Sequence, residues 1–143
     1  MSSRRATAQD RLGFSLVEIM IVIVIIGLLA GAVTLNVRGY LNRAKANTAR
    51  SEIATIVQAL ETFYASYGRY PTNEEGIAIL ARASEKIPEP LLKDLPSDPW
   101  GRPYQYNSPG RNGPFEVICY GGDGREGGSG VDGDITSDKL KEQ

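Results

Sequence analysis

The chain has 143 residues, which is enough for one domain and a membrane anchor. Its 16 basic and 17 acidic residues nearly cancel, so the charge gives no indication of a nucleic-acid-binding surface. There is no histidine, and the single cysteine, Cys119, excludes an intrachain disulfide and has no imidazole base to activate its thiol. We therefore do not expect an enzyme.

The N-terminal part of the chain changes abruptly from polar to apolar. Residues 1–13 contain three arginines and one aspartate, and the run at 14–35 has Glu18 as its one charge and no proline. As a helix with a rise of ~1.5 Å per residue, this run is long enough to cross the hydrocarbon core of a bilayer. The excess of arginine predicts that the N-terminal side stays in the cytoplasm and that the rest of the chain lies outside the inner membrane.

Three interpretations of the apolar run compete. A secretory signal has an apolar stretch of about 7–15 residues and a small-residue cleavage site, whereas this run is longer and no such site closes it clearly. A plain single-pass anchor fits the length but does not account for Glu18, because a carboxylate inside a membrane helix costs on the order of 2.5–3.5 kcal/mol. In the third interpretation, the helix is retained and its acid has a partner.

The sequence GFSLVE, from Gly13 to Glu18, resembles the processing site of type IV pilins and pseudopilins. The resemblance implies that a prepilin peptidase and methyltransferase of the inner membrane cleaves between Gly13 and Phe14 and methylates the new N-terminus. Residues 1–13 are then a cleaved basic leader, and 14–35 form a transmembrane helix that later enters a filament core. Glu18 is implied to pair with the terminal ammonium of an adjacent subunit during assembly, which removes much of the penalty for burying a lone charge.

A second helical pattern continues the first. Apolar residues at helical spacing predict one buried stripe on an amphipathic helix at 36–67. They are Ile53, Ile56, Val57, Leu60, Phe63, Tyr64 and Tyr67. Gly68 and Pro71 mark the end of this helix. We expect one helix from Phe14 to about Tyr67, whose second half packs on the protein's own head.

Residues 68–143 are expected to form a small globular head. A short helix is predicted at 73–81, with Thr72 or Asn73 as its cap. Prolines at 96–103 indicate turns, in which Trp100 is expected to pack the loop against the long helix.

The sequence of the second half of the head predicts strands joined by loops. Two antiparallel strands are predicted at 104–106 and 115–120, with Cys119 as a small buried residue in the second. The polar tail at 135–143 is expected to be frayed.

Two head segments, 68–76 and 95–104, closely resemble the major pseudopilin of type II secretion systems. With the processing motif, the likeness extends from Gly13 to about Ile135.

The segment at 120–135 is rich in glycine and aspartate. It has too few apolar side chains to offset the entropy of ordering, so we expect disorder unless something ties it down. Asp123, Asp132 and Asp134 supply carboxylates, and calcium binds such oxygens together with backbone carbonyls in irregular geometry. The spacing is not that of an EF-hand. From these residues alone, a calcium site and a flexible solvated loop are about equally supported.

The resemblance favours calcium, because type II major pseudopilins carry a calcium site in this loop with a GxDG start and a DxD end. The implied ligands are the side chains of Asp123, Asp132 and Asp134, the backbone oxygens of Tyr120 and Arg125, and Ser129 as a further candidate. Calcium then staples a head that has a thin core and no disulfide.

The predicted fold class is α+β and type IV pilin-like: a long N-terminal helix, with a membrane half and an amphipathic half, packed on a small antiparallel β-sheet with a calcium-binding C-terminal loop. The resemblance implies the major structural subunit of a type II secretion pseudopilus. This homo-oligomeric helical filament in the periplasm of a Gram-negative bacterium helps to drive folded proteins across the outer membrane. Before assembly, the subunit is a single-pass inner-membrane protein in contact with lipid, with its head in the periplasm. The implied partners are minor pseudopilins, the inner-membrane assembly platform and the prepilin peptidase.

Two alternatives stay open. A type IV pilin or a competence pseudopilin has the same N-terminus, although most such pilins carry a C-terminal disulfide loop that one cysteine cannot form. An exported soluble calcium-binding module is the alternative from another class.

Overall fold

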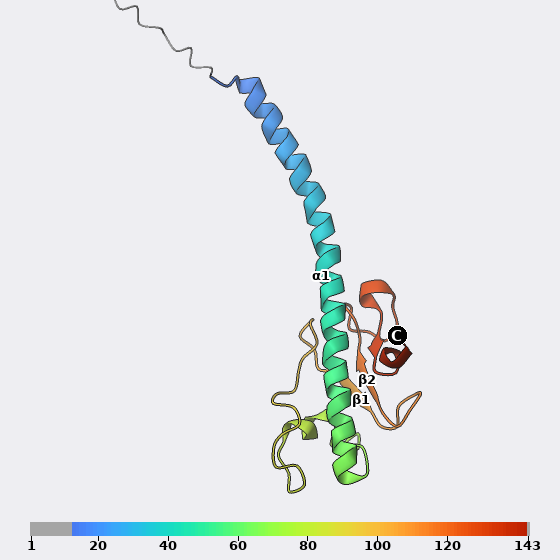
Figure 1. Ribbon diagram of the computed structural model, residues 1–143. Coiled ribbons are helices and arrows are strands. Elements are labelled where there is room, and N and C mark those ends of the chain that lie inside the picture. The colour runs from blue at the N-terminus through green and yellow to red at the C-terminus, as the bar shows by residue number, and fades with distance from the viewer. Residues whose placement is uncertain (1–12, 143) are drawn as a thin grey trace, which may run out of the picture. The chain divides into compact units, whose positions relative to one another are not determined.

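The computed structural model describes residues 13–142, without the side chains at 34–36, 38 and 141–142. Apart from Gly13, the predicted leader at 1–13 lies outside the described residues. The chain divides into two units, one that ends at Arg38 and one that begins at Gly39. Helix α1, Leu16–Tyr67, contributes to both units (Figure 1). The predicted boundary between a membrane half at 14–35 and an amphipathic half at 36–67 stays a prediction.

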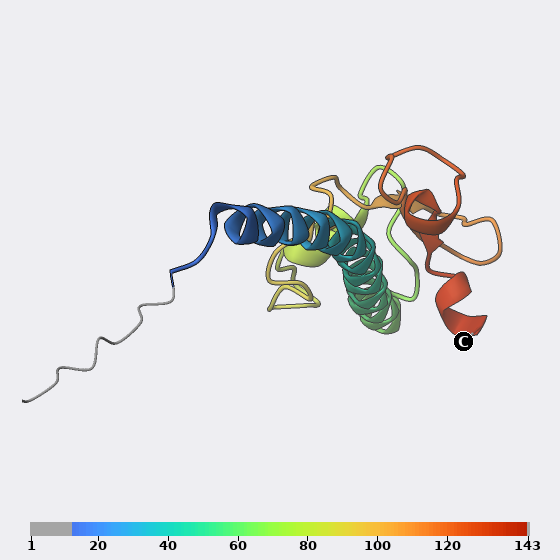
Figure 2. The same ribbon diagram turned by 90° about the horizontal axis from the view of Figure 1, so that it is seen from above.

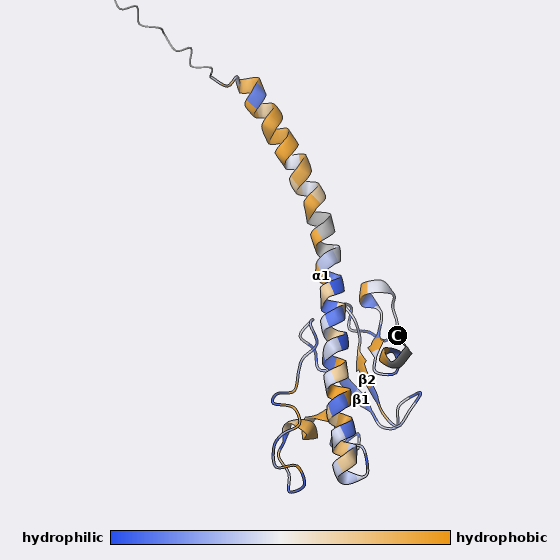
Figure 3. Ribbon diagram, in the orientation of Figure 1, coloured by the Kyte–Doolittle hydropathy of each residue, from blue (hydrophilic) through white to orange (hydrophobic). Residues whose placement is uncertain are grey.

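The first unit is built on the apolar start of α1. The helix begins at Leu16 rather than Phe14, because the Ser15 hydroxyl accepts a hydrogen bond from the Glu18 amide at 3.2 Å and so caps the first turn. Among the described residues, Leu16–Val33 is the one segment long and apolar enough to cross a membrane, and none of it is buried within the protein (Figure 3).

In the second unit, one face of α1 forms the centre of the core. Its buried residues are Ala49, Ile53, Ile56, Ala59, Leu60 and Phe63. Val57 and Tyr67 are partly buried against them. The predicted stripe is therefore confirmed, except that Tyr64 is 45% exposed and stacks on Tyr70 with 4.7 Å between ring centroids.

A three-stranded antiparallel sheet lies beside this part of α1 (Figure 1). Its strands are β1 (Gln105–Asn107), β2 (Glu116–Cys119) and β3 (Ile135–Thr136), in the order β1-β2-β3. The predicted hairpin is confirmed by the pairing of β1 with β2, whereas the sequence analysis did not predict β3.

Both faces of β2 are buried. Because successive side chains of a strand point to opposite faces, Val117 and Cys119 lie on one face and Glu116 and Ile118 on the other. Val117 and Cys119 join the core on α1, as predicted for the cysteine. Burial raises the pKa of the Cys119 thiol to about 11, so this thiol stays protonated at neutral pH.

The expectation of a frayed tail at 135–143 is wrong for its first part. Ile135 and Thr136 pair with β2, and residues 139–142 form the short 3₁₀ helix η3 (Lys139–Glu142; Figure 2). The Ser137 amide donates to the Val117 carbonyl at 3.0 Å, and the Val117 amide donates to the Ser137 hydroxyl at 3.0 Å. These residues are ordered because they give the buried edge of β2 its hydrogen-bond partners.

The helix predicted at 73–81 is shorter than expected. A turn at 73–76 precedes the 3₁₀ helix η1 (Ile77–Ala81), because Gly76 has a positive φ of 58° that ends any helical backbone before it. Thr72, one of the two predicted caps, closes the turn together with Glu75. The Thr72 amide donates to Glu75 Oε2 at 2.8 Å, and the Glu75 amide donates to the Thr72 hydroxyl at 3.3 Å.

Candidate functional site

The predicted processing site lies just before α1. Gly13 and Phe14 precede the helix and are exposed, and the first helical hydrogen bonds run to the Ser15 carbonyl, from the amides of Glu18 at 3.1 Å and Ile19 at 3.3 Å. The peptide bond between them is therefore open to a peptidase without any unwinding of the helix. Ser15 marks the boundary, since its hydroxyl caps α1.

Glu18 lies in the first turn of α1 and is exposed. The positive end of the helix dipole favours a carboxylate at this position. Among the described residues, Glu18 takes part in none of the ion pairs.

The C-terminal loop, residues 121–134, is held by contacts within the chain. The Gly122 amide donates to the Val131 carbonyl at 2.9 Å, which joins the start of the loop to its end. The 3₁₀ helix η2 (Gly130–Asp132) shapes the returning arm. The sequence did not lead us to expect these internal ties.

The structure does not bring the three predicted carboxylate ligands together. Asp123 Oδ1 accepts the Arg125 amide at 3.0 Å, and Asp134 Oδ2 accepts the Gly127 amide at 2.8 Å. Asp132 is exposed. Within the described residues, no three acidic or cysteine side chains are close enough to hold a metal ion.

The remaining predicted ligands are spread along the same loop. The Tyr120 carbonyl accepts the Gly124 amide at 3.0 Å, and the Ser129 carbonyl accepts the Asp132 amide at 3.2 Å. Arg125 and Ser129 are exposed. Each of these carbonyls keeps a second lone pair, so the present hydrogen bonds do not exclude a cation.

One atom of the loop fits a cation well. Asp134 Oδ1 is buried, and no donor among the described residues reaches it. A buried acceptor left without a partner costs about 1–3 kcal/mol, and more when it is charged. The loop thus offers calcium the oxygen donors that it prefers, but Asp123 and Asp132 have to move toward Asp134 to complete a shell.

Asp98, next to this loop, is a buried carboxylate that was not predicted from the sequence. Asp98 Oδ1 accepts the Trp100 amide at 2.9 Å and the Arg102 amide at 2.8 Å, and Asp98 Oδ2 lies 3.4 Å from Arg102 Nε. An aspartate directly before a proline-containing turn is a recognisable sequence signal for such bonding. The turn holds Trp100 against the core, with Lys45 Nζ 5.8 Å from its ring centroid, as predicted for this tryptophan.

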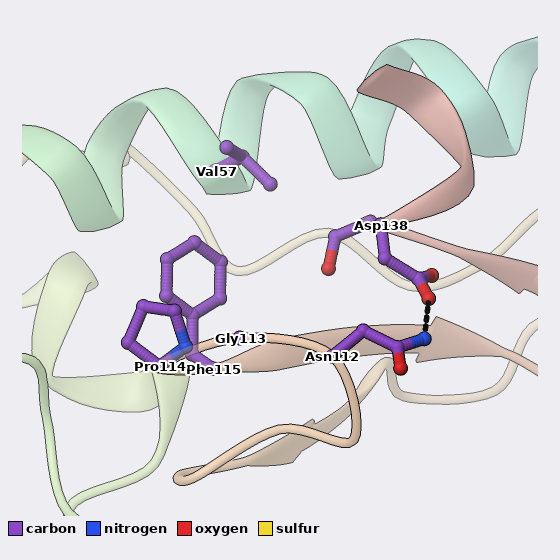
Figure 4. Close-up of a pocket in the computed structure, with 7 residues that line it drawn as sticks. Val57, Asn112, Gly113, Pro114, Phe115 and Asp138 are labelled. Carbon is purple, nitrogen blue, oxygen red and sulfur yellow. Dashed lines mark hydrogen bonds between the residues drawn. The ribbon is translucent and has the colours of Figure 1, made fainter. Parts of the chain in front are cut away.

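The head also has a hollow of about 290 Å³ between α1 and the β1–β2 loop (Figure 4). Its lining residues are Val57, Asn112, Gly113, Pro114, Phe115, Ser137 and Asp138. Asp138 is the one acid in this lining, and the Asn112 amide donates to it at 2.7 Å. Hydrogen bonds from Thr136 and Asn112 lower the pKa of Asp138, so it stays ionised. The lining offers no second titratable group for acid–base catalysis.

Comparison with known sequence families gives two matches. Residues 36–138 match the family described as type II secretion system protein G. Residues 9–34 match the prokaryotic N-terminal methylation motif, which includes the predicted processing site.

Curated relatives share most of their length with the chain. The type II secretion system core protein G of Pseudomonas aeruginosa is 42% identical over 130 residues, which cover 86% of this chain and 92% of the relative. The protein of the same description from Aeromonas hydrophila is 39% identical and covers 91% and 94%. Among solved structures, the major pseudopilin from the type 2 secretion system of enterohaemorrhagic Escherichia coli is 28% identical. It aligns with a TM-score of 0.57 over 71% of this chain and 93% of that one.

Proposed function

The chain belongs to the type II secretion system protein G family, and from this premise we propose how its two candidate sites serve the filament. It is the major pseudopilin of a type II secretion system, a structural subunit rather than an enzyme. Its N-terminal hydrophobic helix and its family agree with an inner-membrane protein that has a periplasmic domain.

The N-terminal site is the place of maturation. The prepilin peptidase cuts between Gly13 and Phe14 and methylates the amino group of Phe14. The observation that carries this proposal is the position of that bond, which is exposed and lies outside α1, directly before an apolar helix that remains attached. The methylation motif at residues 9–34 supports the same assignment.

The mature helix then moves from lipid into a filament of identical copies. The exposed apolar surface of Leu16–Val33 needs a cover, which is lipid before assembly and the same helix of neighbouring copies afterwards. Glu18 has no ion pair among the described residues and pairs with the Phe14 ammonium of an adjacent copy. The minor pseudopilins and the inner-membrane platform are the further partners of this assembly. The filament helps to drive folded proteins across the outer membrane.

Intact-mass measurement of the mature protein tests the maturation proposal. We expect a chain that starts at a methylated Phe14. A mature chain that starts beyond residue 30 indicates a cleaved secretory signal instead, and it overturns the proposed role of the helix and of Glu18. A matched control is Gly13→Val, because the added side chain obstructs the cleavage position and leaves the leader attached.

The C-terminal loop is a structural calcium site. We assign the side chains of Asp123, Asp132 and Asp134 as ligands, the carbonyls of Tyr120 and Arg125, and Ser129 as a further ligand. Three observations support this: the donors are all oxygens, Asp134 Oδ1 is buried without a partner, and Gly122 bonds the two arms of the loop to each other. Bound calcium supplies a cross-link between these arms, in a head that has one cysteine.

Calorimetric titration and thermal unfolding test the calcium proposal on the full chain in detergent. We expect chelation to lower the Tm of the head, and Asp134→Asn to reproduce that loss without responding to chelator. Glu126→Gln is the matched control, since Glu126 lies on the same loop, is exposed, and is not assigned as a ligand. A wild-type melting curve that chelator does not change removes the calcium site and leaves the family assignment intact.

A further inference from the structure

A buried carboxylate and an arginine connect the turn at 96–103 to the C-terminal loop. Asp98 is 5% exposed and receives the amides of Trp100 and Arg102. The Cys119 thiol is 3.6 Å from Asp98 Oδ2, so the carboxylate is anchored on β2 as well. These bonds hold Asp98 in one place, and Asp98 in turn holds the Arg102 side chain through Nε at 3.4 Å.

The other end of the Arg102 guanidinium reaches the start of the loop. Arg102 Nη2 donates a hydrogen bond to the Gly121 carbonyl, 19 residues later in the chain. Arg102 therefore bridges a fixed carboxylate and a loop carbonyl with two different nitrogens, which the planar fork of arginine allows.

Gly124 shows how closely the loop packs on this side chain. A Cβ atom at Gly124 would overlap Arg102 Nη1, and Gly124 has a positive φ of 71°. The same residue donates its amide to the Tyr120 carbonyl at 3.0 Å. The turn from Tyr120 to Gly124 is thus built around the guanidinium, and glycine is the residue that leaves room for it.

We propose that Arg102 is a positioning residue for the C-terminal loop: it holds the backbone of residues 120–124 in place for the cation, while the Asp123 side chain moves to complete the shell. The ordering of the loop by Arg102 does not require the metal. The role of that order in binding a cation rests on the calcium site proposed above. The residues that it places include Tyr120 and Asp123, a proposed carbonyl ligand and a proposed carboxylate ligand.

The positive charge of Arg102 could instead weaken calcium binding, because a guanidinium near a cation site repels the cation. The contacts of Arg102 indicate that this repulsion is not the main effect. The ion pair of Arg102 is made with Asp98, and none of the ion pairs among the described residues joins it to Asp123, Asp132 or Asp134. The loop carboxylates therefore stay available, and the neighbouring Asp98 offsets the arginine charge.

Hydrogen–deuterium exchange on the full mature chain in detergent, with chelator present, tests this proposal. In Arg102→Gln, we expect exchange of residues 120–127 to rise by about fivefold to tenfold, the effect of losing a charge-assisted hydrogen bond from a side chain that is 34% exposed. Calcium titration of the same variant should show weaker binding by a similar factor. Exchange in the buried part of α1, residues 53–63, should not change, which separates loop positioning from loss of the fold.

Two further variants complete the test. Arg82→Gln removes the same charge from an exposed arginine of the head that takes part in none of the ion pairs among the described residues, so exchange of residues 120–127 should stay at the wild-type rate. Arg102→Lys keeps the charge but cannot bridge Asp98 and Gly121 with two nitrogens, and exchange should rise as in Arg102→Gln. If Arg102→Gln does not fold, exchange in Arg102→Lys tests the proposal in its place.

The outcomes are distinguishable. Unchanged exchange in Arg102→Gln and Arg102→Lys overturns the proposal, and so does tighter calcium binding by Arg102→Gln, which shows that repulsion dominates. If wild-type protein binds no calcium but both variants still exchange faster, the calcium site is wrong and the ordering of the loop by Arg102 stands.

Discussion

Tyr104, just before β1, donates a hydrogen bond from its hydroxyl to the carboxylate of Glu52 on α1, 52 residues earlier in the chain. Tyr104 is buried, so this bond forms inside the contact between the helix and the start of the sheet. Burial and, after it, the hydrogen bond to Glu52 raise the pKa of the Tyr104 phenol well above its ordinary value. The pair is a polar tie between parts of the chain that are remote in sequence.

Replacing Tyr104 with phenylalanine should destabilise the head. The substitution keeps the ring but leaves the Glu52 carboxylate without its donor, and an unpaired acceptor of this kind costs about 1–3 kcal/mol. Chemical denaturation of the full chain in detergent measures the difference. Tyr64→Phe is the control, because Tyr64 is 45% exposed and should change the free energy of unfolding by less than about 0.5 kcal/mol. Equal effects of the two variants contradict the role given to the buried bond.

The same phenol predicts a loss of stability in alkali. Its pKa is higher in the folded chain than in the unfolded chain, so folding favours the neutral phenol. The stability that this gives is complete below the unfolded value of about 10 and falls as the pH rises from there toward the folded pKa. Unfolding curves at pH 9 and pH 11 should therefore differ more for wild type than for Tyr104→Phe. An identical pH dependence of the two proteins excludes Tyr104 as the titrating group.

Glu18→Gln should separate membrane insertion from assembly. The neutral amide is easier to place in a bilayer, so insertion should be unchanged, but it cannot form an ion pair with an ammonium. We expect fewer cross-linked multimers in membranes from cells that carry the variant. Glu18→Asp, which keeps the charge on a shorter side chain, should retain part of the assembly. Wild-type amounts of filament from Glu18→Gln rule out the proposed pairing.

Ser137→Ala tests the importance of the tail. The serine hydroxyl accepts the buried Val117 amide at 3.0 Å, and the substitution leaves that amide without a partner at a cost of about 1–3 kcal/mol. Thermal unfolding should show a lower Tm. Ser66→Ala, at an exposed position on α1, serves as the comparison and should leave the Tm nearly unchanged. If Ser137→Ala melts like wild type, the tail does not support β2.

The long helix could be predicted because the residues that specify it, its apolar repeat and the glycine at its end, lie within or next to the helix itself. Ile53, Ile56 and Leu60 recur at the helical period, and Tyr67 is directly followed by a glycine with a φ of 71°. The hairpin was equally visible, since β1 and β2 are apolar or alternating segments with a turn between them.

The surroundings of the C-terminal loop could not be predicted in this way. The bond from Arg102 to Gly121 joins two turns, and no periodicity of the sequence connects them. Ile135 and Ser137 stand in a polar stretch, and their order comes from the edge of β2, which is made elsewhere in the chain. The carboxylates were recognisable as oxygen donors, but their present distances depend on the loop backbone, which residue types alone do not determine.

The late position of β3 has a consequence for biosynthesis. A growing polypeptide contains α1, β1 and β2 well before Ile135 has been added, so the sheet lacks its third strand until residues 135–137 have been synthesised. A copy that terminates early therefore keeps β2 as an open edge, with the Val117 amide unpaired, and is exposed to proteolysis and to pairing with other chains. The third strand therefore completes the sheet only in copies that extend at least to Ser137.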